Sequence, residues 1–155
     1  MEAGSIDEPQ FWSKFSQKCN IDLSKYQVSP WSEYYRTIMI INQPLLKFVR
    51  SLKSKGYKIA ILSNTDAAAV KRLKNLKIVN EFDVAVFSCE VGVLKPDKRI
   101  YKLALEKLDV RPEEAIFIDD QERWVEAARR LGIRGIVFQD INDLQQKIKL
   151  ILSSS

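Results

Sequence analysis

The sequence predicts an α/β fold in which a parallel sheet is flanked by helices. Short apolar segments that end in polar residues alternate with amphipathic segments of helical periodicity. This alternation is typical of βα units, in which consecutive strands run parallel. Residues 1–42 depart from it, because they contain no expected strand and hold seven of the fifteen aromatic residues. We therefore expect a helical segment over 1–42 and an α/β core over 43–155.

The N-terminal segment is expected to contain two helices. Phe11, Trp12 and Phe15 share one face of a short helix, and a second helix is expected near Trp31–Ile38. Because both helices carry aromatic residues, we expect them to form a small cap that packs on the sheet.

The elements of the core follow one another in a regular order. Pro44 can begin a helix, which Gly56 ends. Strands are expected over about 57–62, 82–88, 114–118 and 133–138. Further helices are expected over 67–76, 97–108, 122–131 and 142–152.

Histidine is absent from the chain, and its absence excludes several kinds of catalytic site. A Ser–His–Asp triad, a Cys–His pair and a zinc site of the HExxH kind all require it. Any catalysis must therefore use carboxylates, lysine, hydroxyl groups and a hard metal ion.

The composition also bounds the location and the partners of the protein. The acidic, polar N-terminus is no signal peptide, and the apolar runs are too short to span a bilayer. Cys19 and Cys89 lie far apart, which is typical of a reduced cytoplasmic protein. The net charge of +5 is spread over several expected helices, which favours solvated helix faces over a nucleic-acid-binding surface. We expect a cytoplasmic protein with no membrane partner and no nucleic-acid partner.

Polar residues follow three of the expected strands. Ser63 and Asn64 follow the first, Lys95 lies in the loop after the second, and Asp119 and Asp120 follow the third. The carboxyl ends of parallel strands meet at one edge of the sheet, where ligands bind. A hydroxyl and an amide can donate to an anion, lysine can neutralise it, and paired carboxylates suit Mg²⁺, which usually shares a phosphate ligand. Together they predict a site for phosphoryl transfer.

Each of these residues has a plainer interpretation when taken alone. Ser63 and Asn64 could form a turn, Lys95 could lie on the surface, and Asp119 and Asp120 could cap the following helix. Their occurrence together, at successive strand ends, favours the site.

At these residues the chain resembles the haloacid dehalogenase-like (HAD) hydrolase superfamily. Ser63 matches its motif II, Lys95 within LKPDKRIY matches motif III, and the Asp119–Asp120 pair within IFIDD matches motif IV. The resemblance implies a Rossmann-like sheet with the strand order 5-4-1-2-3 and a small helical cap at the N-terminus. It also implies hydrolysis of phosphate monoesters by Mg²⁺-assisted phosphoryl transfer to an aspartate.

The resemblance also implies a role for each matched residue. Ser63 would bind the phosphate, as Asn64 also could, and Lys95 would neutralise the phosphate and the nucleophile. Asp120 would be the direct Mg²⁺ ligand, and Asp119 would hold a metal-bound water. The paired acids favour a phosphatase over a dehalogenase, and the expected substrate is a small phosphorylated molecule that the sequence does not identify.

One part of the family pattern is missing from the sequence. Motif I is Asp-x-Asp at the end of the first, central strand, and no two of the ten aspartates are two positions apart. We therefore expect the isolated chain to be inactive and to bind Mg²⁺ weakly. The strands at 57–62 and 114–118 would each have an unpaired edge. We expect these strands to pair directly, or a second copy of the chain or a complementing N-terminal segment to fill the slot.

Trp124 is a second departure, since related sequences carry Asn or Asp near the metal at this position. Its plainer role is packing on the helix face with Val125 and Ala128. Two functions remain open. The chain is either a truncated or separately completed phosphatase, or a degenerate, non-catalytic domain that binds a partner or a phosphorylated ligand. An unrelated basic binding module is the least favoured interpretation.

Overall fold

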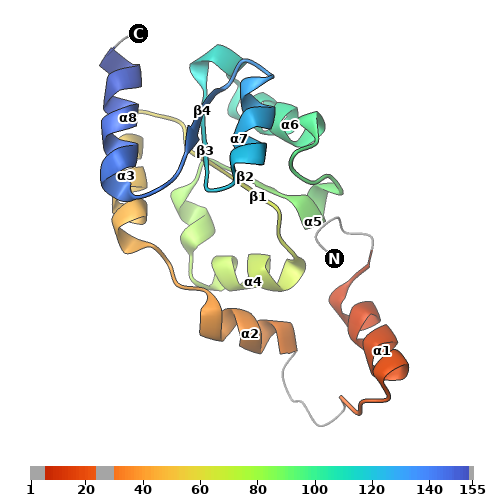
Figure 1. Cartoon of the computed structure of the whole chain (residues 1–155). Coiled ribbons are helices and arrows are strands. Elements are labelled where there is room, and N and C mark those ends of the chain that lie inside the picture. The colour runs from red at the N-terminus through yellow and green to blue at the C-terminus, as the bar shows by residue number, and fades with distance from the viewer. Residues whose placement is uncertain (1–5, 24–29, 154–155) are drawn as a thin grey trace.

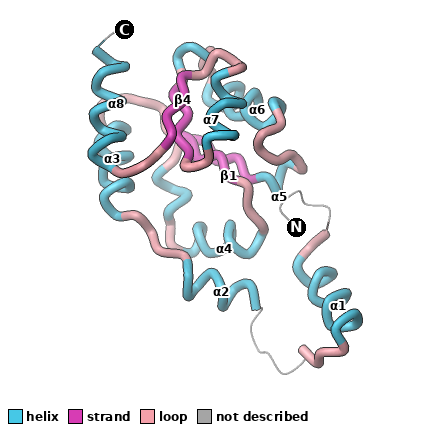
Figure 2. Tube along the Cα trace, viewed as in Figure 1, coloured by secondary structure: helices cyan, strands magenta, loops and turns pink. Residues whose placement is uncertain are grey.

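The computed structural model describes residues 6–23 and 30–153 of the chain. Helices and strands alternate through the core in the predicted order (Figure 2). The helices and strands are α1 (Glu8–Cys19), α2 (Pro30–Ile38), α3 (Gln43–Lys53), β1 (Ala60–Ser63), α4 (Ala67–Asn75), β2 (Val84–Phe87), α5 (Ser88–Val91), α6 (Lys98–Leu108), β3 (Ile116–Asp119), α7 (Glu122–Arg129), β4 (Arg134–Val137) and α8 (Ile141–Ser153). Two short 3₁₀ helices, η1 (Ile78–Glu81) and η2 (Pro112–Glu114), complete them.

The four strands form two separate parallel pairs. β1 pairs with β2, starting with Ala60 opposite Val84, and β3 pairs with β4, starting with Ile116 opposite Arg134. These two pairings are the outer halves of the expected order 5-4-1-2-3. Within the described residues, no strand lies between β1 and β3. The expectation that these two strands pair directly is therefore wrong.

The inner edges of β1 and β3 carry main-chain groups that point away from their partner strands. The Ile59 carbonyl accepts from the N–H of Val84, so the alternate residues Ala60 and Leu62 face away from β2. In the same way, the Asp119 carbonyl accepts from the N–H of Phe138, so Ile116 and Ile118 face away from β4. Both edges have the main-chain pattern of strands that can accept a further neighbour.

The first strand begins at Ala60 rather than at Tyr57, and it includes Ser63. The N–H of Ile59 donates to Oδ2 of Asp83 at 2.9 Å, and Nζ of Lys58 donates to the Leu108 carbonyl at 2.7 Å. The apolar run that starts at Tyr57 therefore predicted too long a strand, because the Ile59 N–H bonds a side chain and only the Ile59 carbonyl bonds β2.

Helices cover both faces of the strands (Figure 1). On one side, α3 and α8 enclose a core around Ile136, Leu144 and Ile148. On the other side, α6 and α7 enclose a second core of buried side chains, which consists of Val86, Ile100, Tyr101, Ala104, Leu105, Ala128 and Ile133. This three-layer arrangement is the predicted Rossmann-like α/β fold.

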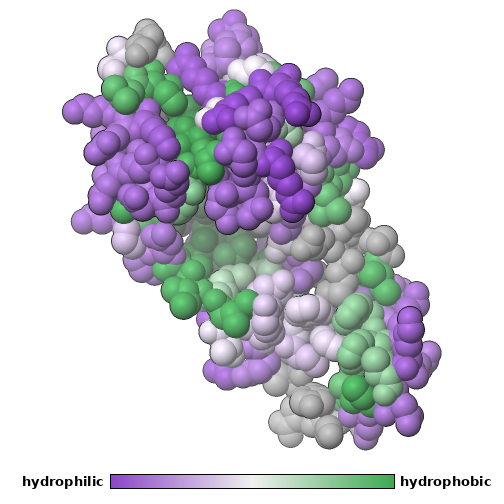
Figure 3. All heavy atoms as spheres, viewed as in Figure 1, coloured by the Kyte–Doolittle hydropathy of each residue, from purple (hydrophilic) through white to green (hydrophobic). Residues whose placement is uncertain are grey.

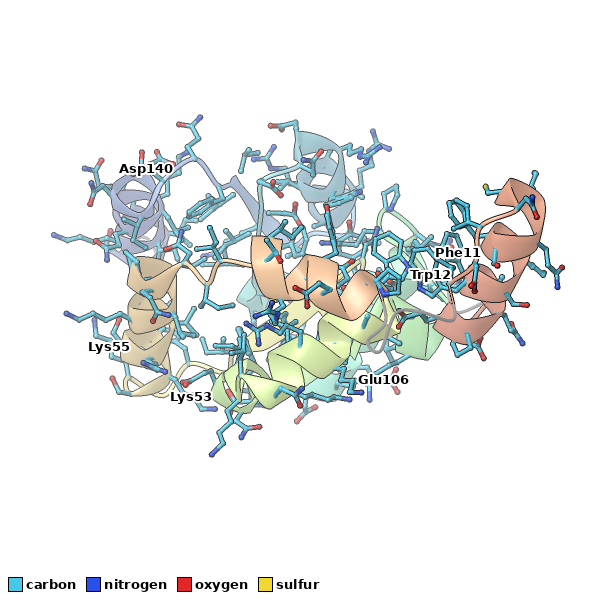
Figure 4. All side chains as sticks on the ribbon, turned by 90° about the horizontal axis from the view of Figure 1, so that it is seen from below. Phe11, Trp12, Lys53, Lys55, Glu106 and Asp140 are labelled. Carbon is cyan, nitrogen blue, oxygen red and sulfur yellow. The ribbon has the colours of Figure 1, made fainter. Side chains whose placement is uncertain are left out.

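The N-terminal helices contact each other through aromatic rings. Figure 4 shows Phe11 and Trp12 on the side of α1 that faces the rest of the molecule, and their ring centroids lie 6.1 and 5.8 Å from that of Trp31 in α2. α2 in turn packs along α4, and the Tyr35 hydroxyl donates to Oδ2 of Asp66 at 2.7 Å. The two helices occur where their patterns predicted them, and α2 packs against a helix next to β1.

The link between α2 and α3 carries exposed apolar side chains. Figure 3 shows a hydrophobic patch on this part of the surface, where Ile38 is 48% exposed and Ile40 is 88% exposed. In the described ranges, every helix is too short or too polar to cross a membrane.

Candidate functional site

Lys95 lies at the centre of the candidate site. It follows α5 in the chain and is only 6% exposed, so the alternative of a surface lysine is wrong. Its Nζ donates to Oδ2 of Asp119 at 2.6 Å and to the carbonyl of Leu62 at 3.2 Å. Because that carbonyl faces away from β2, the Lys95 ammonium lies between the carboxyl ends of β1 and β3.

Asn64 holds the loop that carries Lys95. Its Oδ1 accepts from the Lys95 N–H at 2.7 Å, and its Nδ2 donates to the Lys95 carbonyl at 3.0 Å. The structure thus brings Asn64 and Lys95 together, with Ser63 next to them at the end of β1. The amide of Asn64 positions the main chain of Lys95, and phosphate binding by Ser63 and Asn64 stays a prediction.

The two neighbouring aspartates have different surroundings. The Asp119 side chain is 9% exposed, and its Oδ1 accepts from the N–H of Gln121 at 2.9 Å while Oδ2 is paired with Lys95. Asp120 is exposed to solvent. Both oxygens of Asp119 are therefore bonded within the chain, and Asp120 is the more accessible of the two carboxylates.

These two aspartates do not by themselves make a magnesium site. Mg²⁺ prefers octahedral coordination by oxygen, and proteins usually hold it through carboxylates together with substrate phosphates. Among residues 6–23 and 30–153, no group of three or more acidic or cysteine side chains is placed to hold a metal ion. The nearest cation to Asp119 is the Lys95 ammonium, so the expected metal ligands are one exposed carboxylate and one neutralised carboxylate.

Trp124 takes part in the site as an aromatic wall. Nζ of Lys95 lies 4.3 Å from the centroid of the Trp124 ring and 5.5 Å from that of Phe117. An ammonium at this distance is attracted to the negative face of an aromatic ring, and the attraction increases when water is excluded. The interpretation of Trp124 as a packing residue therefore missed its contact with Lys95.

Tyr101 contacts the ring of Phe117 and the main chain of Trp124. It is 1% exposed, its hydroxyl donates to the Trp124 carbonyl at 2.9 Å, and its ring meets that of Phe117 edge to face at 5.2 Å. Burial raises the pKa of Tyr101 to about 12, and the negative charge of Asp119 adds to the effect. The hydroxyl therefore stays protonated at neutral pH and keeps its role as a donor.

Two further buried polar residues hold the loop after β1, and neither was predicted as part of the site. Asp66 accepts from the N–H groups of Ala68 and Ala69 at 2.9 and 3.0 Å and so caps α4. The Ser88 hydroxyl accepts from the N–H of Thr65 at 2.9 Å and donates to its carbonyl at 3.1 Å. An acidic residue before an alanine-rich helix is a capping signal that could have found Asp66. No local sequence pattern predicts the role of Ser88, because its partner Thr65 is 23 positions away in the chain.

Comparison with known proteins places the chain among hydrolases. The chain matches the haloacid dehalogenase-like hydrolase family over residues 6–132. A phosphorylated carbohydrates phosphatase from Thermotoga maritima is 42% identical over 101 residues, which cover 63% of this chain and 45% of that protein. A bifunctional epoxide hydrolase 2 from Sus scrofa is 34% identical over 72% of this chain and 21% of its own length. The chain thus spans less than half the length of each of these relatives.

Solved structures agree with this family assignment. A HAD family enzyme from Bacteroides thetaiotaomicron, solved as a magnesium complex, matches with a TM-score of 0.77 and 26% identity over 89% of this chain and 72% of that one. Its wild-type complex with magnesium and inorganic phosphate matches with a TM-score of 0.75 and 25% identity. The family match covers most of the chain, and the strand pairs and helices have the fold of these enzymes. The chain belongs to the haloacid dehalogenase-like hydrolase family.

Proposed function

We propose that this chain carries the phosphate-binding and acidic parts of a phosphatase site that an Asp-x-Asp strand completes. The observation that carries the proposal is the buried Lys95 ammonium, held between the carboxyl ends of β1 and β3. Ligands of parallel sheets bind at such strand ends. A fixed cation at this position can stabilise the negative charge of a phosphoryl group during transfer.

The proposed substrate is a small phosphorylated molecule. The relatives include a phosphorylated carbohydrates phosphatase and a phosphoserine phosphatase as well as two (S)-2-haloacid dehalogenases. The paired carboxylates of Asp119 and Asp120 favour a phosphate ester over a haloacid as the substrate class. Ser63 and Asn64 would donate hydrogen bonds to the phosphate, and Lys95 would neutralise it. Asp120 and Asp119 would hold Mg²⁺ once the added strand and the phosphate supply further oxygen ligands.

The nucleophile of the proposed reaction is the first aspartate of an Asp-x-Asp motif. This motif does not occur in the 155 residues of the sequence. Without it, the chain can hold a phosphate but lacks the expected aspartate that would accept the phosphoryl group.

Both cysteines are free thiols, which supports the cytoplasm as the compartment of the protein.

A second candidate function is a non-catalytic domain that binds a partner or a phosphorylated ligand. Two observations favour it. Lys95 and Asp119 neutralise each other, and Trp124 occupies the position where a polar residue would support a metal.

The purified chain is expected to hydrolyse p-nitrophenyl phosphate in the presence of Mg²⁺ no faster than a folded Lys95→Ala control. The reason is that the electrostatic groups remain but the nucleophile does not. The measurement is release of p-nitrophenolate over time. Robust turnover that is lost in Asp120→Asn would contradict the expectation and imply an unrecognised nucleophile. Turnover that appears only when an Asp-x-Asp strand is supplied would support the phosphatase over the non-catalytic domain.

A further inference from the structure

We infer that the ammonium of Lys95, rather than a metal ion, is the cation that neutralises Asp119 in this chain, and that Trp124 holds it there. The inference concerns the same site as the proposed function, but it does not depend on phosphatase activity. Metal binding without any substrate distinguishes which cation the site holds.

Three groups lie closest to the Lys95 ammonium, and the Phe117 ring lies farther away, at 5.5 Å. Oδ2 of Asp119 lies 2.6 Å from Nζ, the Leu62 carbonyl lies 3.2 Å from it, and the centroid of the Trp124 ring lies 4.3 Å from it. A lysine ammonium has three N–H bonds. The two oxygens take two of them, which leaves one for the face of the ring. The ammonium therefore has a full set of partners within the chain.

Burial strengthens the pairing of Lys95 with Asp119. The side chains are 4% and 9% exposed, so water screens their attraction little. Removing either partner from such a pair leaves an uncompensated buried charge, which is strongly unfavourable. A divalent ion that approaches Asp119 must therefore displace the ammonium or lie beside another positive charge. Either arrangement lowers the affinity of Asp119 for the metal.

The Trp124 ring favours an ammonium over a hydrated metal ion. Mg²⁺ gives up its water reluctantly, and its bound waters need hydrogen-bond acceptors. The indole group offers only one N–H donor, whereas its ring face attracts an ammonium without water. The Tyr101 hydroxyl donates to the main-chain carbonyl of Trp124 and so anchors the turn of α7 that carries the ring. Trp124 is thus a positioning residue for Lys95.

The first test measures Mg²⁺ binding by calorimetry and by the shift of the thermal midpoint. In Lys95→Met the resident cation is gone, and Asp119 is free for a metal. We expect the affinity for Mg²⁺ to rise by at least about tenfold over that of the unmodified chain, with a matching rise in the thermal midpoint at millimolar Mg²⁺. The control is Lys98→Met, which removes the same charge from an exposed lysine nearby and should leave Mg²⁺ binding unchanged. The double variant Lys95→Met with Asp119→Asn should lose the gain.

The second test changes the ring and keeps Lys95, so it remains decisive if Lys95→Met fails to fold. Trp124→Phe keeps an aromatic face and should bind Mg²⁺ as weakly as the unmodified chain. Trp124→Asn removes the ring, adds an acceptor and should bind Mg²⁺ more tightly. Equal affinities in these two variants would overturn the role of Trp124. Micromolar binding by the unmodified chain, or no gain in folded Lys95→Met, would overturn the inference as a whole.

Discussion

Replacing Lys95 with methionine is expected to lower the free energy of unfolding by about 3–5 kcal/mol, the usual cost of breaking a buried ion pair. Methionine is similar in length and apolar, so most of the packing of the stem is kept. The loss comes from Asp119, whose carboxylate loses its partner at 9% side-chain exposure. A small domain is stable by only about 5–15 kcal/mol, so the change is a large share of the total. Urea unfolding at neutral pH should show a lower midpoint with an unchanged slope.

Two further variants separate the ion pair from other effects. Lys98→Met should lose little stability, because Lys98 is exposed. Adding Asp119→Asn to Lys95→Met should recover part of the loss, because the carboxamide carries no charge. If Lys95→Met were as stable as Lys98→Met, the pair between Lys95 and Asp119 would not be the buried contact described above.

A peptide that forms an apolar strand ending in Asp-x-Asp is expected to bind between β1 and β3 and to raise the thermal midpoint of the chain. The main-chain groups of Ala60, Ile116 and Ile118 and the N–H of Leu62 face away from their partner strands and can pair with the peptide, while the Leu62 carbonyl accepts from Lys95. Unpaired main-chain groups are costly when they are removed from water. A ligand that binds only the folded chain stabilises it in proportion to the logarithm of its concentration. The same peptide should confer hydrolysis of p-nitrophenyl phosphate in the presence of Mg²⁺.

Matched peptides test the two parts of this expectation separately. An Asn-x-Asn peptide of the same strand should raise the midpoint without conferring turnover. A peptide with proline inside the strand should do neither, because proline cannot donate to a ladder. A chain that is monomeric by light scattering and ignores every peptide would show that β1 and β3 need no further neighbour. A midpoint that rises with the concentration of the chain itself would indicate that a second copy fills the slot.

Local patterns predicted most of the fold. Apolar periodicity placed the helices of the core, and the alternation of elements predicted a parallel sheet. The start of β1 was missed because the amide of Ile59 bonds the side chain of Asp83, which is 24 positions away. A local sequence pattern cannot predict a hydrogen bond between residues so far apart in the chain. The separation of the four strands into two pairs was not predicted either. Among the described residues no strand lies between β1 and β3, and no local pattern indicates whether two such strands then pair directly.

The proximity of Asn64, Lys95 and Asp119 was predicted from the sequence, but the ion pair between Lys95 and Asp119 was not. Strand-end topology was sufficient to expect Ser63, Asn64, Lys95 and Asp119 close together. It could not predict that Lys95 would bond Asp119, because that contact depends on the direction of a long side chain. The ring of Trp124 was missed for the same reason, since its contact with Lys95 crosses from α7 to the loop before α6.

The open inner edges of β1 and β3 also affect how the main chain exchanges hydrogen with water. The amides of Ile61 and Ser63 face β2, whereas those of Ala60 and Leu62 face the other way. Exchange at the first pair requires the two strands to separate, and exchange at the second pair requires only that water reach the inner edge. Neighbouring amides of one short strand are therefore protected by different events. In deuterated water, the amide hydrogens of β1 should exchange at alternating rates. Those of Ile61 and Ser63 should exchange slowly, and those of Ala60 and Leu62 should exchange faster.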